Sequence, residues 1–276
     1  MSRTLGLIAG SGRLPFEVLE GAREHGVGVA MVAIEGNADP ALAHEPCSAL
    51  LWTPLGQLSR TIAFLKHAGA EHVILAGAVA KREALRDPGT LQLDDRAMTL
   101  LGRVRVRGDD ALLRALAEEL EAEKLPVIES TRYIQDRLSR AGRLAGPPPD
   151  PRCQADLALG LRVARVLGDA DVGQSVVVRE GTVLAVEAME GTDATIRRGS
   201  ELGGPGAVVV KAAKPRQDLR FDVPAIGPQT IELARRCALA AIGLEAGQSL
   251  ILEKARTLAE AERAGLSLVG LLAEPS

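Results

Sequence analysis

Histidine is scarce in this chain, which has only four among its 276 residues. Neither the nucleophile elbow G-x-S-x-G nor the metalloprotease motif H-E-x-x-H occurs. The histidines also lie away from the charged segments described below, so we do not expect a Ser-His-Asp or Cys-His mechanism. They are His25, His44, His67 and His72.

Cysteine is also rare, and Cys47, Cys153 and Cys237 show no C-x-x-C spacing. An odd number of widely spaced cysteines is typical of free thiols in a reducing compartment. No pair of them is placed like a zinc site. We therefore expect neither a disulfide framework nor a structural zinc ion.

Aromatic residues make up only 2% of the chain, although hydrophobic residues make up 46% and charged residues 25%. The core of such a globular protein must be built from Leu, Val, Ile and Ala. Stacking partners for bases are few, the net charge is −3 and no basic stripe is visible. These features argue against a nucleic-acid partner.

Long apolar runs are missing as well. No stretch is long enough to cross a bilayer, and the first residues lack the charged and apolar regions of a signal peptide. We therefore expect a cytoplasmic protein, which could still contact a membrane surface.

The first part of the chain has the pattern of a parallel α/β layer. An apolar strand at residues 5–9 is followed by a glycine loop, a helix that begins near Pro15, and a second strand at residues 27–34. A further strand at residues 72–76 ends in Gly77. Because ligands of open α/β sheets gather at the carboxyl ends of strands, the loops at 10–14 and 77–81 should share one edge.

Gly10 and Gly12 allow two interpretations. They could let a phosphate approach backbone N–H groups at a helix N-terminus, or they could simply form a tight turn. The third glycine of the dinucleotide fingerprint is replaced by Pro15. We therefore favour a nucleotide site over a nicotinamide site.

A proline-rich segment, residues 143–152, separates two parts of the chain. Four prolines in ten residues favour an extended spacer over a helix. We predict an α/β protein with a Rossmann-like N-terminal domain at 1–142, this linker, and a mixed-sheet C-terminal domain at 153–276. A cleft between two domains is a common place for a small-molecule site, and we expect the site there.

The second domain should open with a helix, followed by a β-hairpin at residues 175–178 and 182–188. The hairpin leads to Glu187 and Glu190, and then to a short helix that Thr192 or Asp193 could cap. Arg197 and Arg198 lie about one turn further along this helix. Each charge could also be an ordinary surface charge.

The most charged segment is residues 211–227, which follows a short β-branched strand at 207–210. It carries two carboxylates, Asp218 and Asp222, and two prolines that stiffen its backbone. Its cations are Lys211, Lys214, Arg216 and Arg220. Although any one of these charges could belong to a surface ion pair, their clustering favours phosphate or pyrophosphate chemistry with Mg²⁺ or Mn²⁺.

The predicted site therefore combines the glycine loops with the charged segments of the second domain. Asp222, Lys214 and Arg220 are the catalytic candidates, and Asp222 and Glu190 are the candidate metal ligands. The candidate substrate-binding residues are Gly10, Ser11, Gly12, Leu14, Gly77, Thr192, Asp193, Arg197, Lys211 and Gln217.

Ordered motifs along nearly the whole chain carry a family resemblance. They include LIAGSGRLP at residues 7–15, AVEAMEGTD at 185–193 and KPRQDLRFDVP at 214–224. With further matches at 75–77, 108–114, 171–174, 197–198, 211, 225–227 and 230, the chain resembles the LpxI-type UDP-2,3-diacylglucosamine pyrophosphatases of lipid A synthesis. It departs from the family at Ala78 and Ala225, where polar residues are common.

This resemblance implies Mg²⁺-dependent hydrolysis of UDP-2,3-diacylglucosamine to UMP and 2,3-diacylglucosamine 1-phosphate, lipid X. The family's critical aspartate corresponds to Asp222, whether it binds the ion, takes the proton from water, or does both. The resemblance also implies a homodimer and peripheral contact with the cytoplasmic face of the inner membrane. The alternatives are a non-catalytic protein that binds a nucleotide sugar or a lipid, and a nicotinamide oxidoreductase, against which Pro15 argues.

Overall fold

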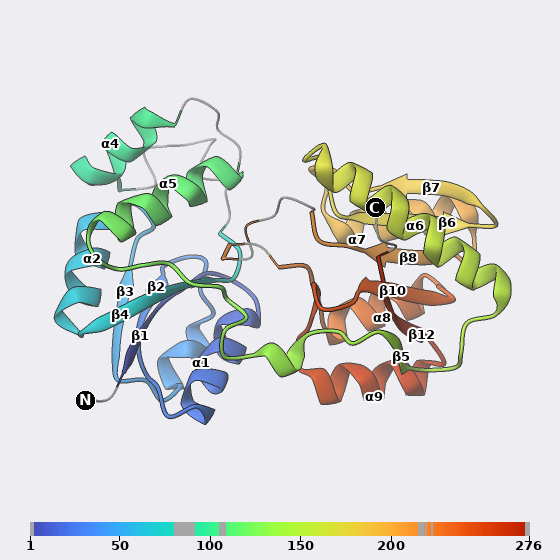
Figure 1. Ribbon diagram of the computed structural model, residues 1–276, viewed down its shortest axis with the longest axis horizontal. Helices are drawn as coiled ribbons and strands as arrows, with labels where there is room; N and C mark the ends of the chain where they lie inside the picture. The colour runs from blue at the N-terminus through green and yellow to red at the C-terminus, as the bar shows by residue number, and fades with distance from the viewer. Residues whose placement is uncertain are drawn as a thin grey trace. The chain divides into compact units, whose positions relative to one another are not determined.

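The chain forms two compact units. The computed structural model describes residues 3–79, 92–104, 109–214, 218, 220–221 and 223–273 (Figure 1). Unit 1 comprises Met1–Gln135 with Asp218–Phe221, and unit 2 comprises Asp136–Gln217 with Asp222–Ser276. Both units are α/β, as the sequence predicts, and each is described by itself below.

Unit 1 contains a parallel four-stranded sheet with the order β3-β2-β1-β4. Its register aligns Leu7 of β1 with Met31 of β2 on one side and with Ile74 of β4 on the other. This arrangement confirms the predicted Rossmann-like parallel sheet. The strands are β1 (Thr4–Ala9), β2 (Gly28–Ile34), β3 (Ala49–Thr53) and β4 (Ala70–Ala76).

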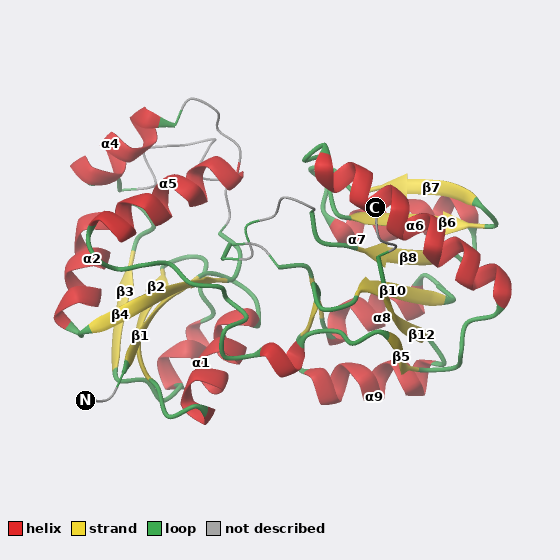
Figure 2. Ribbon diagram, in the orientation of Figure 1, coloured by secondary structure: helices red, strands yellow, loops and turns green. Residues whose placement is uncertain are grey.

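Helices cover both sides of the unit 1 sheet, with α1 and α2 on opposite sides (Figure 2). Alternate residues of β2, Ala30, Val32 and Ile34, join the core made with α2, α4 and α5. This alternation follows from the period of two in a β-strand. The helices are α1 (Leu14–Glu24), α2 (Leu58–His67), α4 (Asp95–Arg103) and α5 (Asp109–Ala122), with a 3₁₀ turn, η1, at Pro40–His44.

Among the described residues, the segment 125–129 makes a single parallel bridge, between Val127 and Val73. The carbonyl of Pro126 accepts from Val73, and the N–H of Ile128 donates to the Val73 carbonyl. Pro126 has no N–H to extend a ladder, which limits the pairing. A 3₁₀ turn, η3 (Gln135–Arg137), follows this segment.

Unit 2 contains a mixed six-stranded sheet with the order β5-β12-β10-β8-β6-β7. The central strands β8, β10 and β12 are parallel, while β5, β6 and β7 pair antiparallel. The mixed sheet and the β6–β7 hairpin are both as predicted. The strands are β5 (Gly142–Ala145), β6 (Ser175–Arg179), β7 (Thr182–Val186), β8 (Val208–Lys211), β10 (Ala241–Glu245) and β12 (Ser267–Leu271).

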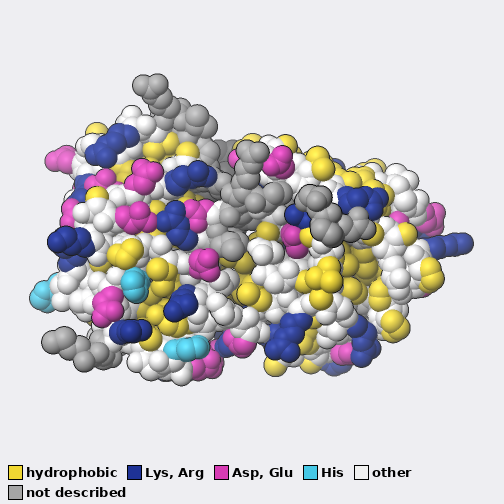
Figure 3. Space-filling model, viewed as in Figure 1, with side chains coloured by type: hydrophobic (Ala, Val, Ile, Leu, Met, Phe, Trp, Pro, Cys, Tyr) yellow, Lys and Arg dark blue, Asp and Glu magenta, His cyan; other side chains and the backbone are white. Residues whose placement is uncertain are grey.

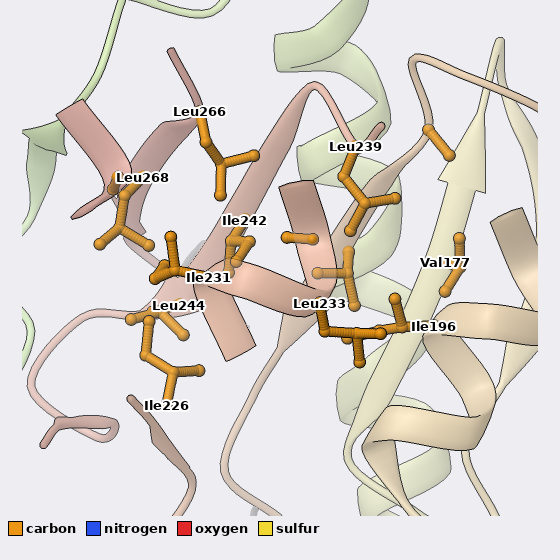
Figure 4. Packing of buried hydrophobic residues seen from close by; sticks show 14 of the residues in the cluster. Val177, Ile196, Ile226, Ile231, Leu233, Leu239, Ile242, Leu244, Leu266 and Leu268 are labelled. Atoms are coloured by element: carbon orange, nitrogen blue, oxygen red, sulfur yellow. The ribbon is translucent and has the colours of Figure 1, made fainter. Parts of the chain in front are cut away.

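The unit 2 sheet is buried on both faces. Val208 and Val210 of β8 pack with α6 (Pro151–Asp169), whereas Val209 points to the other side. There it joins a core with Ile196 of α7 (Thr192–Gly203) and Ile231 of α8 (Pro228–Arg236), shown in Figure 4. Burial of each such side chain contributes about 1.5–3 kcal/mol. Helix α9 (Lys254–Ala264) covers β5 and β12, and β9 (Ala225–Ile226) pairs in parallel with β11 (Leu250–Ile251).

The proline-rich segment 143–152 lies within unit 2 rather than at its border. It contains the end of β5 and the start of α6, where Asp150 caps the helix through the N–H of Cys153 and Pro151 occupies the first turn. The structure divides the chain between Gln135 and Asp136 instead. Proline suits the first turn of a helix because its N–H groups need no partner within the helix, so Pro151 begins α6, whereas the prolines at 147–149 lie in the loop before it.

Candidate functional site

The two glycine loops of unit 1 pair directly. The backbone N–H of Ser11 donates to the carbonyl of Ala78 at 2.7 Å, and the N–H of Ala78 donates back at 3.2 Å. The Ser11 hydroxyl also donates to the Ala78 carbonyl at 2.9 Å. For the part of the second loop that the structure describes, residues 77–79, this confirms that both loops lie at one edge of the sheet.

The glycines of these loops serve different purposes. A Cβ on Gly77 would lie 2.3 Å from the backbone oxygen of Ser11, and one on Gly10 would lie 2.5 Å from that of Ala78. These two glycines are therefore required by the approach of one backbone to the other. Gly12 has a φ of +89°, and a Cβ there would meet nothing within 4 Å. Gly12 thus supplies a left-handed turn beside open space.

Helix α1 starts two residues after Gly12. Its N-cap, Arg13, makes no side-chain capping bond, and its guanidinium lies 4.3 Å from the centre of the Phe16 ring. Leu14 is the first helical residue and Pro15 stands in the first turn. The amino end of α1 therefore has N–H groups that no capping side chain satisfies, which suits an anion.

In unit 2, a polar cluster formed by Ser175, Glu187, Thr192 and Lys211 lies at the amino end of α7. The hydroxyl of Thr192 donates to Oε1 of Glu187 at 2.9 Å. The ammonium of Lys211 donates to the same hydroxyl at 3.1 Å and to the carbonyl of Ala225 at 3.2 Å. The Ser175 hydroxyl lies 3.3 Å from that of Thr192. The cluster is held by four parts of unit 2: β6 carries Ser175, β8 carries Lys211, the end of the hairpin carries Glu187, and α7 carries Thr192.

The N-cap of α7 is Gly191, with no side-chain capping bond, so the expectation that Thr192 or Asp193 caps the helix is wrong. The Thr192 hydroxyl instead donates to Glu187 and accepts from Lys211. Asp193 and Arg197 are exposed on the first turns of α7. Thus the cluster brings together Thr192 and Lys211 among the predicted substrate-binding residues.

The backbone after β8 is fixed at successive residues. The N–H of Ala212 donates to the carbonyl of Gln174 at 3.0 Å, and that of Ala213 donates to Oε2 of Glu245 at 2.9 Å. Lys214 then forms an ion pair with Asp171, with 2.6 Å between Nζ and Oδ1. The direction in which the chain leaves the sheet toward residue 215 is therefore set by unit 2 contacts.

Glu190, a predicted metal ligand, is engaged within unit 2. It accepts the N–H of Ala188 at 3.1 Å and forms an ion pair with Arg198. A hydrogen bond from its own backbone N–H and the Arg198 guanidinium hold the pKa of this carboxyl below its usual value. These contacts show how the carboxylate is oriented, and its role as a metal ligand stays a prediction.

Arg220, a predicted catalytic residue, is held by two carboxylates of unit 1. Its guanidinium donates to both oxygens of Asp218, at 2.6–3.0 Å, and to Oε1 of Glu121 at 2.8 Å. The Arg220 hydrogen bonds hold the pKa of Asp218 below its usual value. Arg220 lines a pocket of about 820 Å³ together with Glu71, Glu129 and other residues near the amino ends of β1 and β4, away from the glycine loops.

Comparison with known proteins identifies the family. Residues 4–137 match the sequence profile of the LpxI N-terminal domain, and residues 140–269 match that of the LpxI C-terminal domain. The chain belongs to the LpxI family. It is similar to the UDP-2,3-diacylglucosamine pyrophosphatase LpxI of Caulobacter vibrioides, with 36% identity over 98% of both chains.

Likeness of this LpxI-family chain to solved structures is weak. A UDP-glucose 4-epimerase from Brucella ovis has 10% identity and a TM-score of 0.31, covering 45% of this chain and 33% of its own. An L-threonine dehydrogenase from Phytophthora infestans has 10% identity and a TM-score of 0.29, covering 55% of this chain and 40% of its own. Structural similarity at these TM-scores supports no conclusion about this chain.

Two candidate residues of the LpxI-family site, Asp222 and Gln217, lie outside the described residues. Among those that are described, no group of three or more Asp, Glu, His or Cys side chains could hold a metal ion.

None of the described helices is long and apolar enough to span a membrane. On the face in Figure 3, Lys and Arg side chains are interspersed with Asp and Glu.

Three acids outside the predicted site orient the unit 2 loops of this LpxI-family chain, and of these the sequence pattern had marked only Glu187, as a residue at the end of the hairpin. Asp171 holds Lys214, Glu245 holds the backbone of Ala213, and Glu187 holds Thr192. Glu187 and Glu245 are each only 7% exposed. Glu245 could have been recognised as a single acid at the end of an apolar strand pattern. A charged side chain is rarely buried unless it has a partner, so an acid in that position indicates a buried contact.

Proposed function

We propose that this chain hydrolyses the pyrophosphate bond of UDP-2,3-diacylglucosamine, releasing UMP and 2,3-diacylglucosamine 1-phosphate, lipid X. The observation that carries the proposal is 36% identity over 98% of both chains with a protein named for this activity. Both LpxI domains are matched, so the similarity is not confined to one unit. The protein would then be a hydrolase that acts on a phosphorus anhydride in lipid A synthesis.

The polar cluster of unit 2 suits the phosphate oxygens of such a substrate. Lys211 is anchored by the Thr192 hydroxyl and the Ala225 carbonyl, which fixes where its ammonium lies. The amino end of α7, whose N-cap supplies no side-chain bond, adds N–H groups that favour negative charge. A lysine and a helix amino end would stabilise the negative charge that develops as the pyrophosphate is cleaved.

In unit 1, we assign a share of substrate binding to Gly12 and the amino end of α1. Gly12 faces open space, and no side chain caps the helix that follows. Backbone N–H groups in this arrangement suit a phosphate. Gly10 and Gly77 would contribute indirectly, since their lack of a Cβ lets the two loops pair.

Asp222 is the proposed key carboxylate, by its place in the family motif, with Mg²⁺ as the metal and Mn²⁺ as a substitute. The described carboxylates do not form a metal site by themselves, because none of their groups reaches three ligands. The proposed ligands remain Asp222 and Glu190, whose oxygens suit a hard cation.

The acyl chains of the substrate imply that the enzyme meets it at a membrane surface. We propose peripheral contact with the cytoplasmic face of the inner membrane, tested by flotation of the protein with anionic lipid vesicles.

A homodimer is proposed from the family resemblance, and sedimentation of the full chain tests it. Recovery of a monomer at all concentrations would contradict that proposal.

The decisive experiment measures UMP release from UDP-2,3-diacylglucosamine by chromatography. We expect turnover that chelation abolishes and Mg²⁺ restores, and loss of turnover in Asp222→Ala but not in Glu201→Gln, a change to an exposed acid of α7. Normal turnover in Asp222→Ala would remove Asp222 from the mechanism. Tight binding of substrate without UMP at any Mg²⁺ concentration would support the non-catalytic alternative instead.

A further inference from the structure

Glu187 is a buried acid with an unusual environment. Its side chain is 7% exposed, and the backbone of Gly173 passes so close that a Cβ there would lie 2.1 Å from the Glu187 carbonyl oxygen. Oε1 accepts from Thr192, whereas Oε2 is buried without a protein donor among the described residues. A buried carboxylate with so few donors is costly unless a positive charge lies nearby.

That positive charge is Lys211, and Thr192 connects it to Glu187. A hydroxyl has one proton to donate and two lone pairs to accept with. Since an ionised carboxylate only accepts, the Thr192 proton goes to Oε1 of Glu187 at 2.9 Å. Both lone pairs of the hydroxyl then remain for donors, and Lys211 at 3.1 Å and Ser175 at 3.3 Å lie within reach.

We propose that Glu187 is a positioning residue, which acts through Thr192 to fix the ammonium of Lys211 at the amino end of α7. The inference rests on the proposed function, in which Lys211 binds phosphate oxygens of the substrate. Glu187 does not touch the substrate. Its charge orients the Thr192 hydroxyl so that the hydroxyl can only accept from Lys211, and hydrogen bonds in such a chain strengthen one another.

Glu187 is not required merely to fill space or to cap a helix. The N-cap of α7 is Gly191, and Oε2 of Glu187 makes no bond to the helix backbone that the structure describes. Glutamine has nearly the same shape as glutamate but no charge, and its amide can donate as well as accept. Glu187→Gln therefore separates a role in orienting the Thr192 hydroxyl from a role in packing.

The kinetic test compares Glu187→Gln, Thr192→Val and the double variant. We expect kcat to fall roughly 10- to 100-fold in each single variant, the range that follows from losing a hydrogen bond to a charged group. The double variant should be no slower than the slower single variant, because both changes break the same chain. Thr192→Ser keeps the hydroxyl and should recover most of the turnover that Thr192→Val loses.

A second measurement does not need turnover. Mass spectrometry follows acetylation of Lys211 by acetic anhydride in the full chain, and we expect Lys211 to react several-fold faster in Glu187→Gln than in the wild type. Glu201→Gln is the matched control, because Glu201 is an exposed acid of α7, the helix that carries Thr192, and its change should leave the rate as it is.

The outcomes separate this inference from the proposed function. Additive kinetic losses, or a Glu187→Gln variant that keeps wild-type kcat and wild-type Lys211 reactivity, would overturn the positioning role. If the wild type releases no UMP, the proposed function fails, while the acetylation rates still report whether Glu187 controls Lys211. Urea unfolding of Glu187→Gln checks that a lower kcat does not come from a loss of folded protein.

Discussion

The two units build the ends of their parallel strands in different ways. In unit 1, the loops after β1 and β4 are joined by backbone bonds, and Gly10 and Gly77 are needed for their close approach. In unit 2, side chains hold the end of β8, where Glu245 of β10 accepts the backbone N–H of Ala213 and Thr192 links Glu187 to Lys211. In unit 1, the edge of the sheet therefore depends on glycines that leave room for the backbone. In unit 2, it depends on buried charged side chains that hold the backbone and one another.

This difference predicts different responses to substitution. A backbone contact at van der Waals distance cannot accept even a methyl group without moving, because protein interiors are close-packed. A side-chain contact can lose its charge and keep its shape, so its variants should affect the position of one group more than the fold.

Gly77→Ala should have the largest effect on stability. The new Cβ would meet the Ser11 oxygen at 2.3 Å and would also sit at a φ of +87°. We expect a loss of about 3–5 kcal/mol in the free energy of unfolding, measured with urea, because strain and overpacking add. Gly12→Ala is the matched control, since its φ is +89° but its surroundings are open.

For Gly12→Ala, we expect a loss of only about 1–2 kcal/mol, the cost of the left-handed conformation alone. Equal losses in the two variants would mean that close approach of the loops contributes nothing. That result would contradict the proposed difference between the two edges, because Gly77 would then be needed only for its backbone conformation.

Glu245→Ala should have an intermediate effect. The side chain is 7% exposed and accepts the N–H of Ala213, so its removal leaves a buried donor without a partner. The expected loss is about 1–3 kcal/mol by urea unfolding. Glu245→Gln keeps an oxygen that can accept this N–H and should lose less, whereas a similar loss in both variants would show that the charge, rather than the hydrogen bond, stabilises the segment.

Arg220→Met should have the smallest effect, and the effect should depend on pH. Asp218 has a lowered pKa in the folded protein, mainly because Arg220 donates hydrogen bonds to it. Its contribution is therefore present above the unfolded pKa of about 3.9 and is lost as the pH falls through the lower folded pKa. Because these side chains are 25–43% exposed, we expect no more than about 1 kcal/mol at pH 7.

The difference between wild type and Arg220→Met should shrink in urea titrations as the pH falls below 4, because Asp218 then takes up a proton in both proteins. A difference that stays constant with pH would show that Arg220 stabilises unit 1 through its packing on Phe221, whose ring centre lies 4.9 Å from the guanidinium. Glu121→Gln removes only the second carboxylate and serves as the control.

Much of the fold could be predicted from local patterns. β-branched and apolar runs marked β1, β2, β6 and β8, and the turn at Glu180 and Gly181 marked the hairpin. The shared edge of the glycine loops followed from the rule for parallel strands. The division between the units could not be predicted in this way, because the prolines at 147–149 lie in a loop inside unit 2 and Pro151 begins α6, so they do not separate domains.

From the sequence alone came most of the element types, the two α/β units and the family motifs, because these depend on the order and periodicity of residues. Only the tertiary structure decided which charges meet. Arg220 pairs with Glu121, 99 positions away, Ala213 with Glu245, 32 away, and Lys211 with Thr192, 19 away. Such partners are chosen by strand order and by the cost of leaving a buried polar group unpaired, which no local pattern records.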